Sequence, residues 1–258
     1  MTSPGRLMAP AIQPALFHHR ADSVPVHPEV AERRTAVPEW TKRDRRDVFN
    51  GRLLAGLTVV QPYDIPAIDR CTLVPDRLVC FSEAVRMSSP DPLAWVHPYE
   101  DDYKAERFWS MPEKYFERLR GFAGVISPDY SLYRNMPTAL QISNTYRNHL
   151  LGARMQSDGF NVITNVRLSG RESIPYALAG VPSHSTLALG LHGCTKSLEN
   201  RPHVIEEVGI VCDYCEPTCL VVYGSPEYGV LTRPREMGIP VYVYRPDSHD
   251  RSTARRPA

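Results

Sequence analysis

The 258-residue sequence lacks the features of a membrane or exported protein. No apolar run approaches the roughly 20 residues that a membrane-spanning helix needs. Its first residues, MTSPGRLMAPAIQPALFHHR, lack the basic start and apolar stretch of a signal peptide. Without an export signal, the six cysteines are expected to be reduced thiols. These absences predict a cytoplasmic protein that has no membrane partner.

The sequence also has little net charge and few standard motifs. A net charge of +1 argues against strong non-specific binding of the whole chain to nucleic acid. No strand is followed by GxGxxG, and no GxSxG surrounds Ser131, which argues against a standard dinucleotide fold and a serine hydrolase. Hydrophobic residues make up 42% of the chain, enough for a packed core.

The two ends of the chain differ from its middle. Prolines break residues 1–46, which close on the charged stretch RRTAVPEWTKRDRR, and residues 246–258 are polar and unpatterned. We therefore predict a flexible arm over 1–46, a single α/β domain over 47–245 and a flexible tail over 246–258.

Apolar runs of strand length alternate with helical patterns between these ends. NMPTALQISNTYRNHLLGARMQSDG (135–159) predicts a helix with Asn135 as N-cap and Pro137 in its first turn. Ala139 and every third or fourth residue after it are expected to form its buried face. YEDDYKAERFW (99–109) reads as an acidic loop, either a lid or a solvated segment. Further helices are expected over 111–122 and 196–214, and strands over 53–60, 77–85, 124–127, 160–166, 186–191, 219–224 and 239–244.

This alternation predicts an α/β fold with a largely parallel sheet and helical crossovers. The strands are apolar throughout, as expected where both faces of a sheet are covered. About six or seven strands suit an incomplete β/α-barrel-like form, which we favour, or a doubly wound open sheet.

Polar side chains follow the predicted strands where the crossovers begin, and ligands of parallel α/β folds bind at those carboxyl ends. Asp129 and Glu83 are the candidate catalytic residues, Asp129 as general base or metal-binding carboxylate. The structural alternative for Asp129 is a turn hydrogen bond after Pro128. Arginines that follow the strand ends suit the binding of carboxylate or phosphate groups. Asn144 and Arg147 share one face of the long helix, which could equally be a solvated face. The candidate ligand-binding residues are Ser131, Tyr133, Arg134, Asn144, Arg147, Asn165, Arg167, Lys196, Tyr223 and Glu227.

Two further segments carry chemistry-bearing residues. GLHGCTKS (190–197) is not a phosphate-binding loop of the GxxxxGK[ST] type, but it suggests exposed amides at a helix N-terminus beside Lys196. CDYCEPTC places Cys212, Cys215 and Cys219 at spacings that suit zinc or an iron–sulfur cluster. The alternative is that these cysteines are core residues of a helix and a strand.

Several segments together resemble an uncharacterised domain-of-unknown-function family found in bacterial phages, plasmids and other mobile elements. They are DDYKAERFW, PEKYFERLRGFAGVISPDYSLYRNMP, NTYRNHLLGARMQSDGFNVITNVRLSG, HGC and VVYG, within residues 75–245. SPDYSLYRNMP is the most specific part, and Leu168 departs from the family pattern, which has Trp there. The resemblance implies a mobile-element context and a barrel-like form, and it assigns no reaction or cofactor.

Three functions remain open from the sequence. The first is a pocket, enzymatic or not, for an anionic small molecule such as a nucleotide or sugar phosphate. The second is a nucleic-acid-binding accessory protein that uses the basic residues of 33–46, although acidic residues are interspersed there. The third is binding of a host protein through a tyrosine-rich surface.

Overall fold

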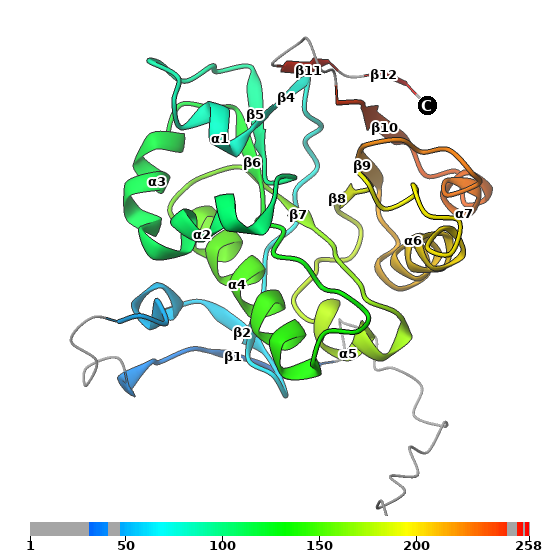
Figure 1. Cartoon of the computed structure of the whole chain (residues 1–258). Helices are drawn as coiled ribbons and strands as arrows, with labels where there is room; N and C mark the ends of the chain where they lie inside the picture. The colour runs from blue at the N-terminus through cyan, green and yellow to red at the C-terminus, as the bar shows by residue number, and fades with distance from the viewer. Residues whose placement is uncertain (1–30, 41–46, 247–251, 255, 258) are drawn as a thin grey trace, which may run out of the picture.

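The computed structural model describes residues 31–40, 47–246, 252–254 and 256–257. Its main sheet has the strand order β11-β4-β5-β6-β7-β8-β9-β10-β12, in which the seven strands β4 to β10 are parallel neighbours (Figure 1). The parallel strands are β4 (Arg77–Cys80), β5 (Ala94–His97), β6 (Gly124–Ile126), β7 (Val162–Asn165), β8 (Thr186–Gly190), β9 (Cys219–Tyr223) and β10 (Val241–Tyr244). The predicted α/β, barrel-like fold is confirmed.

Helices cover the outside of this sheet. In Figure 1, α2 and α3 lie on the side of β4 to β6, and α6 and α7 lie on the side of β8 to β10. The helices are α1 (Phe81–Ala84), α2 (Asp102–Ser110), α3 (Pro112–Leu119), α4 (Thr138–Ser157), α5 (Ile174–Ala177), α6 (Arg201–Cys215) and α7 (Thr232–Glu236), with 3-10 turns at Gly51–Leu54 and Arg171–Ser173.

The C-terminal segment closes the sheet into a near barrel. β11 (Ser252–Ala254) pairs antiparallel with β4, and β12 (Arg256–Pro257) pairs antiparallel with β10. Because β4 and β10 are the two edges of the parallel sheet, one short segment of chain spans the seam between them. The Tyr244 hydroxyl also donates across this seam to the Pro75 carbonyl.

The barrel has one apolar core inside it and two outside it beneath the helices, and a fourth small cluster lies at the three-stranded sheet. The inner core contains Leu78, Trp95, Tyr99, Ile126, Ile163, Ala188, Val221, Tyr223 and Tyr244. The outer cores lie beneath the helices on either side. Burial on both faces explains why these strands lack polar alternation.

A second sheet of three strands packs beside α4. It joins β1 (Arg33–Thr35), β2 (Thr58–Val60) and β3 (Ile65–Pro66) in antiparallel pairs. The buried ring of His149 on α4 contacts the Pro66 carbonyl through Nδ1 at 2.9 Å. Burial lowers the pKa of His149 to about 4, so the ring is neutral and Nδ1 donates.

The structure corrects several predicted elements. The run 53–60 divides at Gly56, which has φ of +78°, into a 3-10 turn and β2 of the small sheet. β5 was not predicted, and 99–109 is largely helix α2 instead of a loop. The main helix begins at Thr138, with Pro137 and not Asn135 at the N-cap, and Ala139 is exposed.

The predicted domain boundaries stay a prediction. Within the proposed arm 1–46, the described residues 31–40 include β1, which pairs with β2. Residues 1–30 and 41–46 lie outside the described residues, as do 247–251, 255 and 258 of the proposed tail.

Candidate functional site

Asp129 and Arg167 form a bidentate ion pair where β6 and β7 end. The Arg167 Nε donates to Asp129 Oδ1 at 2.9 Å, and Nη2 donates to Oδ2. Asn165, the last residue of β7, donates from Nδ2 to the same Oδ1 at 2.8 Å. The side chains of Asp129 and Arg167 are 7% and 23% exposed. Burial opposes the charge of Arg167, but the Asp129 carboxylate outweighs it and raises the pKa of the guanidinium.

Aromatic rings fill the barrel mouth beside this pair. The Tyr99 hydroxyl donates to Asn165 Oδ1 at 3.1 Å, and its ring stacks on Tyr223 with centroids 5.1 Å apart. His97 packs against the same Tyr223 ring at 4.2 Å. Burial lowers the pKa of His97 to about 3, with His192 adding to the effect, and raises the pKa of Tyr223 to about 12. These rings are therefore neutral at pH 7.

Gly190, at the end of β8, makes room for this cluster. A Cβ on Gly190 would lie 2.5 Å from the Tyr99 ring and 3.1 Å from Arg167 Nη2. Both distances are shorter than ordinary van der Waals contact, so a side chain at this position would displace the ring or the guanidinium.

The segment after Asp129 is fastened to two helices. Asp102, the first residue of α2, accepts the Ser131 amide and hydroxyl, each at 3.2 Å. Asn144 of α4 donates to the Ser131 carbonyl at 2.8 Å. Burial raises the pKa of the Asp102 carboxyl, and the nearby Asp129 adds to this, although the bonds from Ser131 oppose it. Ser131 and Asn144 therefore hold this loop against α2 and α4.

Arg147 and Arg134 have partners outside the Asp129 cluster. Arg147 pairs with Glu106 at 2.5 Å and lies over the Tyr130 ring at 3.7 Å, which stabilises the junction of α2 and α4. Arg134 donates to Asn200 Oδ1 at 2.5 Å and lies 3.8 Å from Glu207. Arg147 thus packs between α2 and α4 with only 16% of its side chain exposed, so it does not form a solvated helix face, whereas Arg134 faces α6.

Four other predicted site residues do not join the cluster. Tyr133 is 56% exposed, Lys196 and Glu227 are exposed, and Glu83 lies half-buried within α1. Among the described residues, the side chains of Glu83, Lys196 and Glu227 make no hydrogen bond or ion pair.

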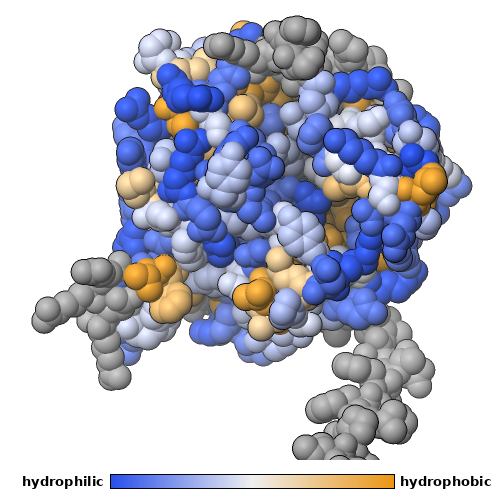
Figure 2. Space-filling view, in the orientation of Figure 1, coloured by the Kyte–Doolittle hydropathy of each residue, from blue (hydrophilic) through white to orange (hydrophobic). Residues whose placement is uncertain are grey.

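A pocket opens beside Arg167, between β7, β8 and α6. Arg167, Cys194 and Glu207 supply its polar wall, and Arg167 Nη1 lies 3.7 Å from Cys194 Sγ. On the face seen in Figure 2, hydrophobic residues lie recessed among hydrophilic ones, next to the place of α6 in Figure 1. The remaining wall consists of Val166, Leu168, Leu189, Gly190, Leu191, Val204, Val208 and Val211.

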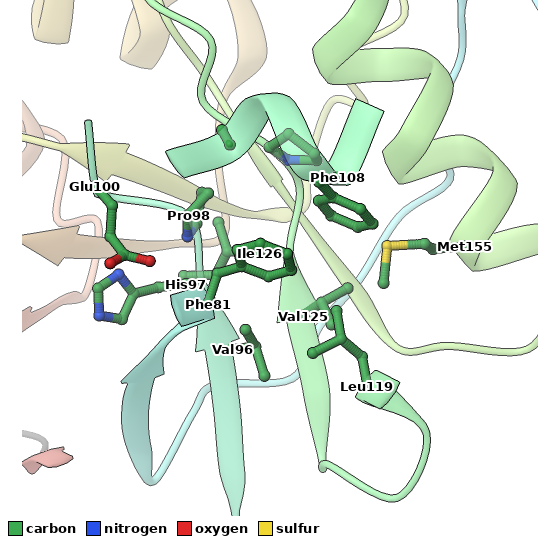
Figure 3. A pocket seen from close by; sticks show the side chains of 12 residues that line it. Phe81, Val96, His97, Pro98, Glu100, Phe108, Leu119, Val125, Ile126 and Met155 are labelled. Atoms are coloured by element: carbon green, nitrogen blue, oxygen red, sulfur yellow. The ribbon is translucent and has the colours of Figure 1, made fainter. Parts of the chain in front are cut away.

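A second pocket, almost wholly apolar, lies between β5, β6 and helices α1 to α4. Figure 3 shows His97 and Glu100 at one end of it and Met155 at the other. Glu100 Oε2 accepts the Ser82 amide at 2.7 Å. Most of its lining belongs to the hydrophobic core beneath α2 and α3, so its shape reflects core packing.

The two further chemical segments differ from the prediction. α6 begins at Arg201, several residues after Lys196, so the helix N-terminus expected for a phosphate site is not at GLHGCTKS. Cys212 and Cys215 are buried on α6 and Cys219 is buried on β9. Within the described part of the chain, no three His, Cys, Asp or Glu residues are placed to hold a metal ion.

Of the predicted site residues, the structure brings Asp129, Asn165, Arg167 and Tyr223 together at one end of the sheet. Tyr99 was missed because its segment was interpreted as an acidic loop, in which Asp102 was weighed only as part of a lid. Acidic residues before an amphipathic stretch also indicate a helix start. Glu207 was missed because helical spacing gives no sign that a single glutamate faces a pocket. None of the helices in the described residues is long and apolar enough to cross a membrane.

The chain matches one protein family and is similar to proteins of two mycobacteriophages. Residues 57–233 match the family described as "Domain of unknown function (DUF4417)". The Gene 1 protein of Mycobacterium phage L5 is 32% identical over 130 residues, which cover 50% of this chain and 57% of that protein. The Gene 1 protein of Mycobacterium phage D29 is 28% identical over 193 residues, covering 73% of this chain and 69% of that protein. No solved structure matches the chain.

Proposed function

Since this chain belongs to the DUF4417 family, whose description assigns no activity, we propose from its geometry that it binds an anionic small molecule at the carboxyl ends of the barrel strands. The observation that carries the proposal is the orientation of Arg167. Asp129 accepts from its Nε and Nη2, while Nη1 lines the pocket beside Cys194. A guanidinium has five N–H donors, so the pair with Asp129 leaves donors for a ligand.

Arginine suits this role because its planar fork matches carboxylate and phosphate groups. Asp129 and Asn165 fix the orientation of the fork before a ligand arrives, which reduces the ordering that binding would otherwise require. Arg134 does not line the pocket but lies 3.8 Å from Glu207, which does, and so adds a second positive charge nearby. Nucleotides and sugar phosphates are the first ligands to test.

Asp129 acts in this proposal as a positioning residue and not as a general base. Its two oxygens already accept three hydrogen bonds from Arg167 and Asn165, and the pairing with a guanidinium makes the carboxylate a weaker base. Whether chemistry follows binding is thus a separate question from the binding itself.

The test is the thermal unfolding of the purified protein against nucleotides, sugar phosphates, inorganic phosphate, divalent metals and short oligonucleotides. A ligand at a hundred times its Kd adds about 2.7 kcal/mol to the free energy of unfolding, which raises Tm by roughly 5–11 °C. The double variant Asp129→Asn/Arg167→Met should lose the shift. The matched control is Asp213→Asn/Arg233→Met, which removes an exposed ion pair between α6 and α7 and should keep it.

Stabilisation by no anion, or an equal shift in both double variants, would contradict the proposal. A nucleic acid bound through residues 33–46 is a second proposal, which predicts stabilisation by oligonucleotides that weakens steeply with salt. Arg34 of this segment pairs with Asp64 at 2.9 Å, and its residues 41–46 lie outside the described residues.

A further inference from the structure

Glu207 of α6 shares the pocket wall with Arg167, and no sequence pattern singled it out. Its Oε1 accepts the Gly170 amide at 3.1 Å, and its side chain is 21% exposed. Apolar side chains of α6, of β8 and of the loop after β7 surround the same pocket. A carboxyl group therefore lies in the pocket where we propose that an anion binds.

The charged and titratable groups around this carboxyl come from three loops and from α6 itself. Arg134 approaches from the loop after β6 at 3.8 Å, and Arg167 from the loop after β7. Cys194 of the loop after β8 lines the pocket as well. On α6 itself, Glu206 is turned to Arg171, with which it pairs at 2.6 Å.

We propose that Glu207 takes up a proton when an anion binds beside Arg167, so that ligand and proton enter this pocket together. The inference rests on the proposed function, because it concerns the same pocket. An anion and an ionised carboxylate side by side in an apolar pocket repel each other strongly, whereas a protonated carboxyl can donate a hydrogen bond to the anion.

The environment of Glu207 supports this coupling. Burial raises the pKa of its carboxyl to about 7, with Arg134 and Arg167 opposing the shift, so little free energy is needed to protonate it near neutral pH. With Glu207 protonated, the charge of Arg134 is no longer offset by this carboxylate, while Arg167 stays paired with Asp129. The aliphatic wall favours a ligand with an apolar part, so the ligand class is an organic anion that carries a carboxylate or phosphate.

The experiment measures Kd at pH 6 and pH 8 with two probes that keep their charge over this range, butyrate and sulfate. If proton uptake accompanies binding, linkage makes the native Kd about tenfold weaker at pH 8 than at pH 6. Titration calorimetry at pH 8 in buffers of different ionisation enthalpy should show uptake of protons. Butyramide, the uncharged counterpart of butyrate, should bind with no such dependence.

Two neighbouring substitutions separate Glu207 from other titrating groups. Glu207→Gln should bind the probes with equal Kd at both pH values, whereas Glu206→Gln should keep the native dependence. Binding by the native protein that does not change with pH would overturn the inference and leave the proposed function standing. A pH dependence that persists in Glu207→Gln would also overturn it, as would binding of neither probe at either pH, whereas the thermal-shift panel decides the proposed function.

Discussion

Replacing Asp129 by Asn tests the ion pair on which the site depends. The substitution removes the negative charge that faces Arg167 and turns one carboxylate oxygen into an N–H donor opposite Nη2. Arg167 then stays in its largely buried position without a counter-charge. Asn165 can still donate to the remaining oxygen of residue 129, so the disturbance is concentrated on the guanidinium.

The magnitude follows from the burial of the two partners. Removal of one partner from a buried pair costs about 3–5 kcal/mol. Because 23% of the Arg167 side chain is exposed to solvent, we expect the lower end of this range, about 3 kcal/mol. For a chain of this size, that loss lowers Tm by roughly 6–12 °C. Chemical denaturation and calorimetry both measure it.

A double-mutant cycle provides the control. Asp129→Asn/Arg167→Met removes both charges and should recover most of the stability, because no unpaired charge remains. The exposed Asp213–Arg233 pair gives the comparison, since Asp213→Asn should cost only about 0–1 kcal/mol. If Asp129→Asn is as mild as Asp213→Asn, or if the double variant is worse than both single variants, the assignment of a buried, oriented pair is wrong.

Three further outcomes are expected. Gly190→Ala should lower the unfolding free energy by about 1–3 kcal/mol, because its Cβ would meet the Tyr99 ring. The control Gly209→Ala, within α6, should raise the unfolding free energy by about 0.5–1 kcal/mol. Equal effects of the two substitutions in denaturant titrations would refute this contrast. Glu207→Gln should raise the unfolding free energy by up to about 3 kcal/mol at pH 8 and by little at pH 4. The reason is that a carboxyl whose folded pKa is raised to about 7 destabilises the fold progressively as pH rises toward that value. A larger gain at pH 4 than at pH 8 would contradict this sign. A chain that ends at residue 246 should unfold at a lower temperature and should self-associate, as measured by light scattering, because β4 and β10 lose their antiparallel partners. An unchanged Tm and a monomeric state would show that β11 and β12 are dispensable.

The fold was predictable where hydrophobic runs were long and bounded by turns. β8 and β9 are continuous apolar strands and were expected close to their observed bounds. β5 was not predicted because its sequence, AWVH, is short, includes a histidine and lies between two prolines. The run 53–60 was predicted as one strand, but an apolar run does not indicate which sheet it joins. The chain turns at Gly56, and only the residues after it form a strand, β2 of the small sheet.

The site was predictable only in part, for a physical reason. Parallel strands end at one edge of the sheet, so Asp129, Asn165 and Arg167 were expected there, and the structure brings them together. Loop length and helix orientation then decide which polar residues reach that edge. Lys196 lies in a longer loop than expected and makes no contact there, while Glu207 reaches the pocket from the middle of α6.

The most direct test of the central claim is a crystal structure of the protein with whichever anion stabilises it most. The account predicts that the anionic group lies within hydrogen-bonding distance of Arg167 Nη1, in the pocket between β7, β8 and α6, with the Asp129 pair intact. An anion bound elsewhere, or one that displaces Asp129 from Arg167, would contradict the proposed site.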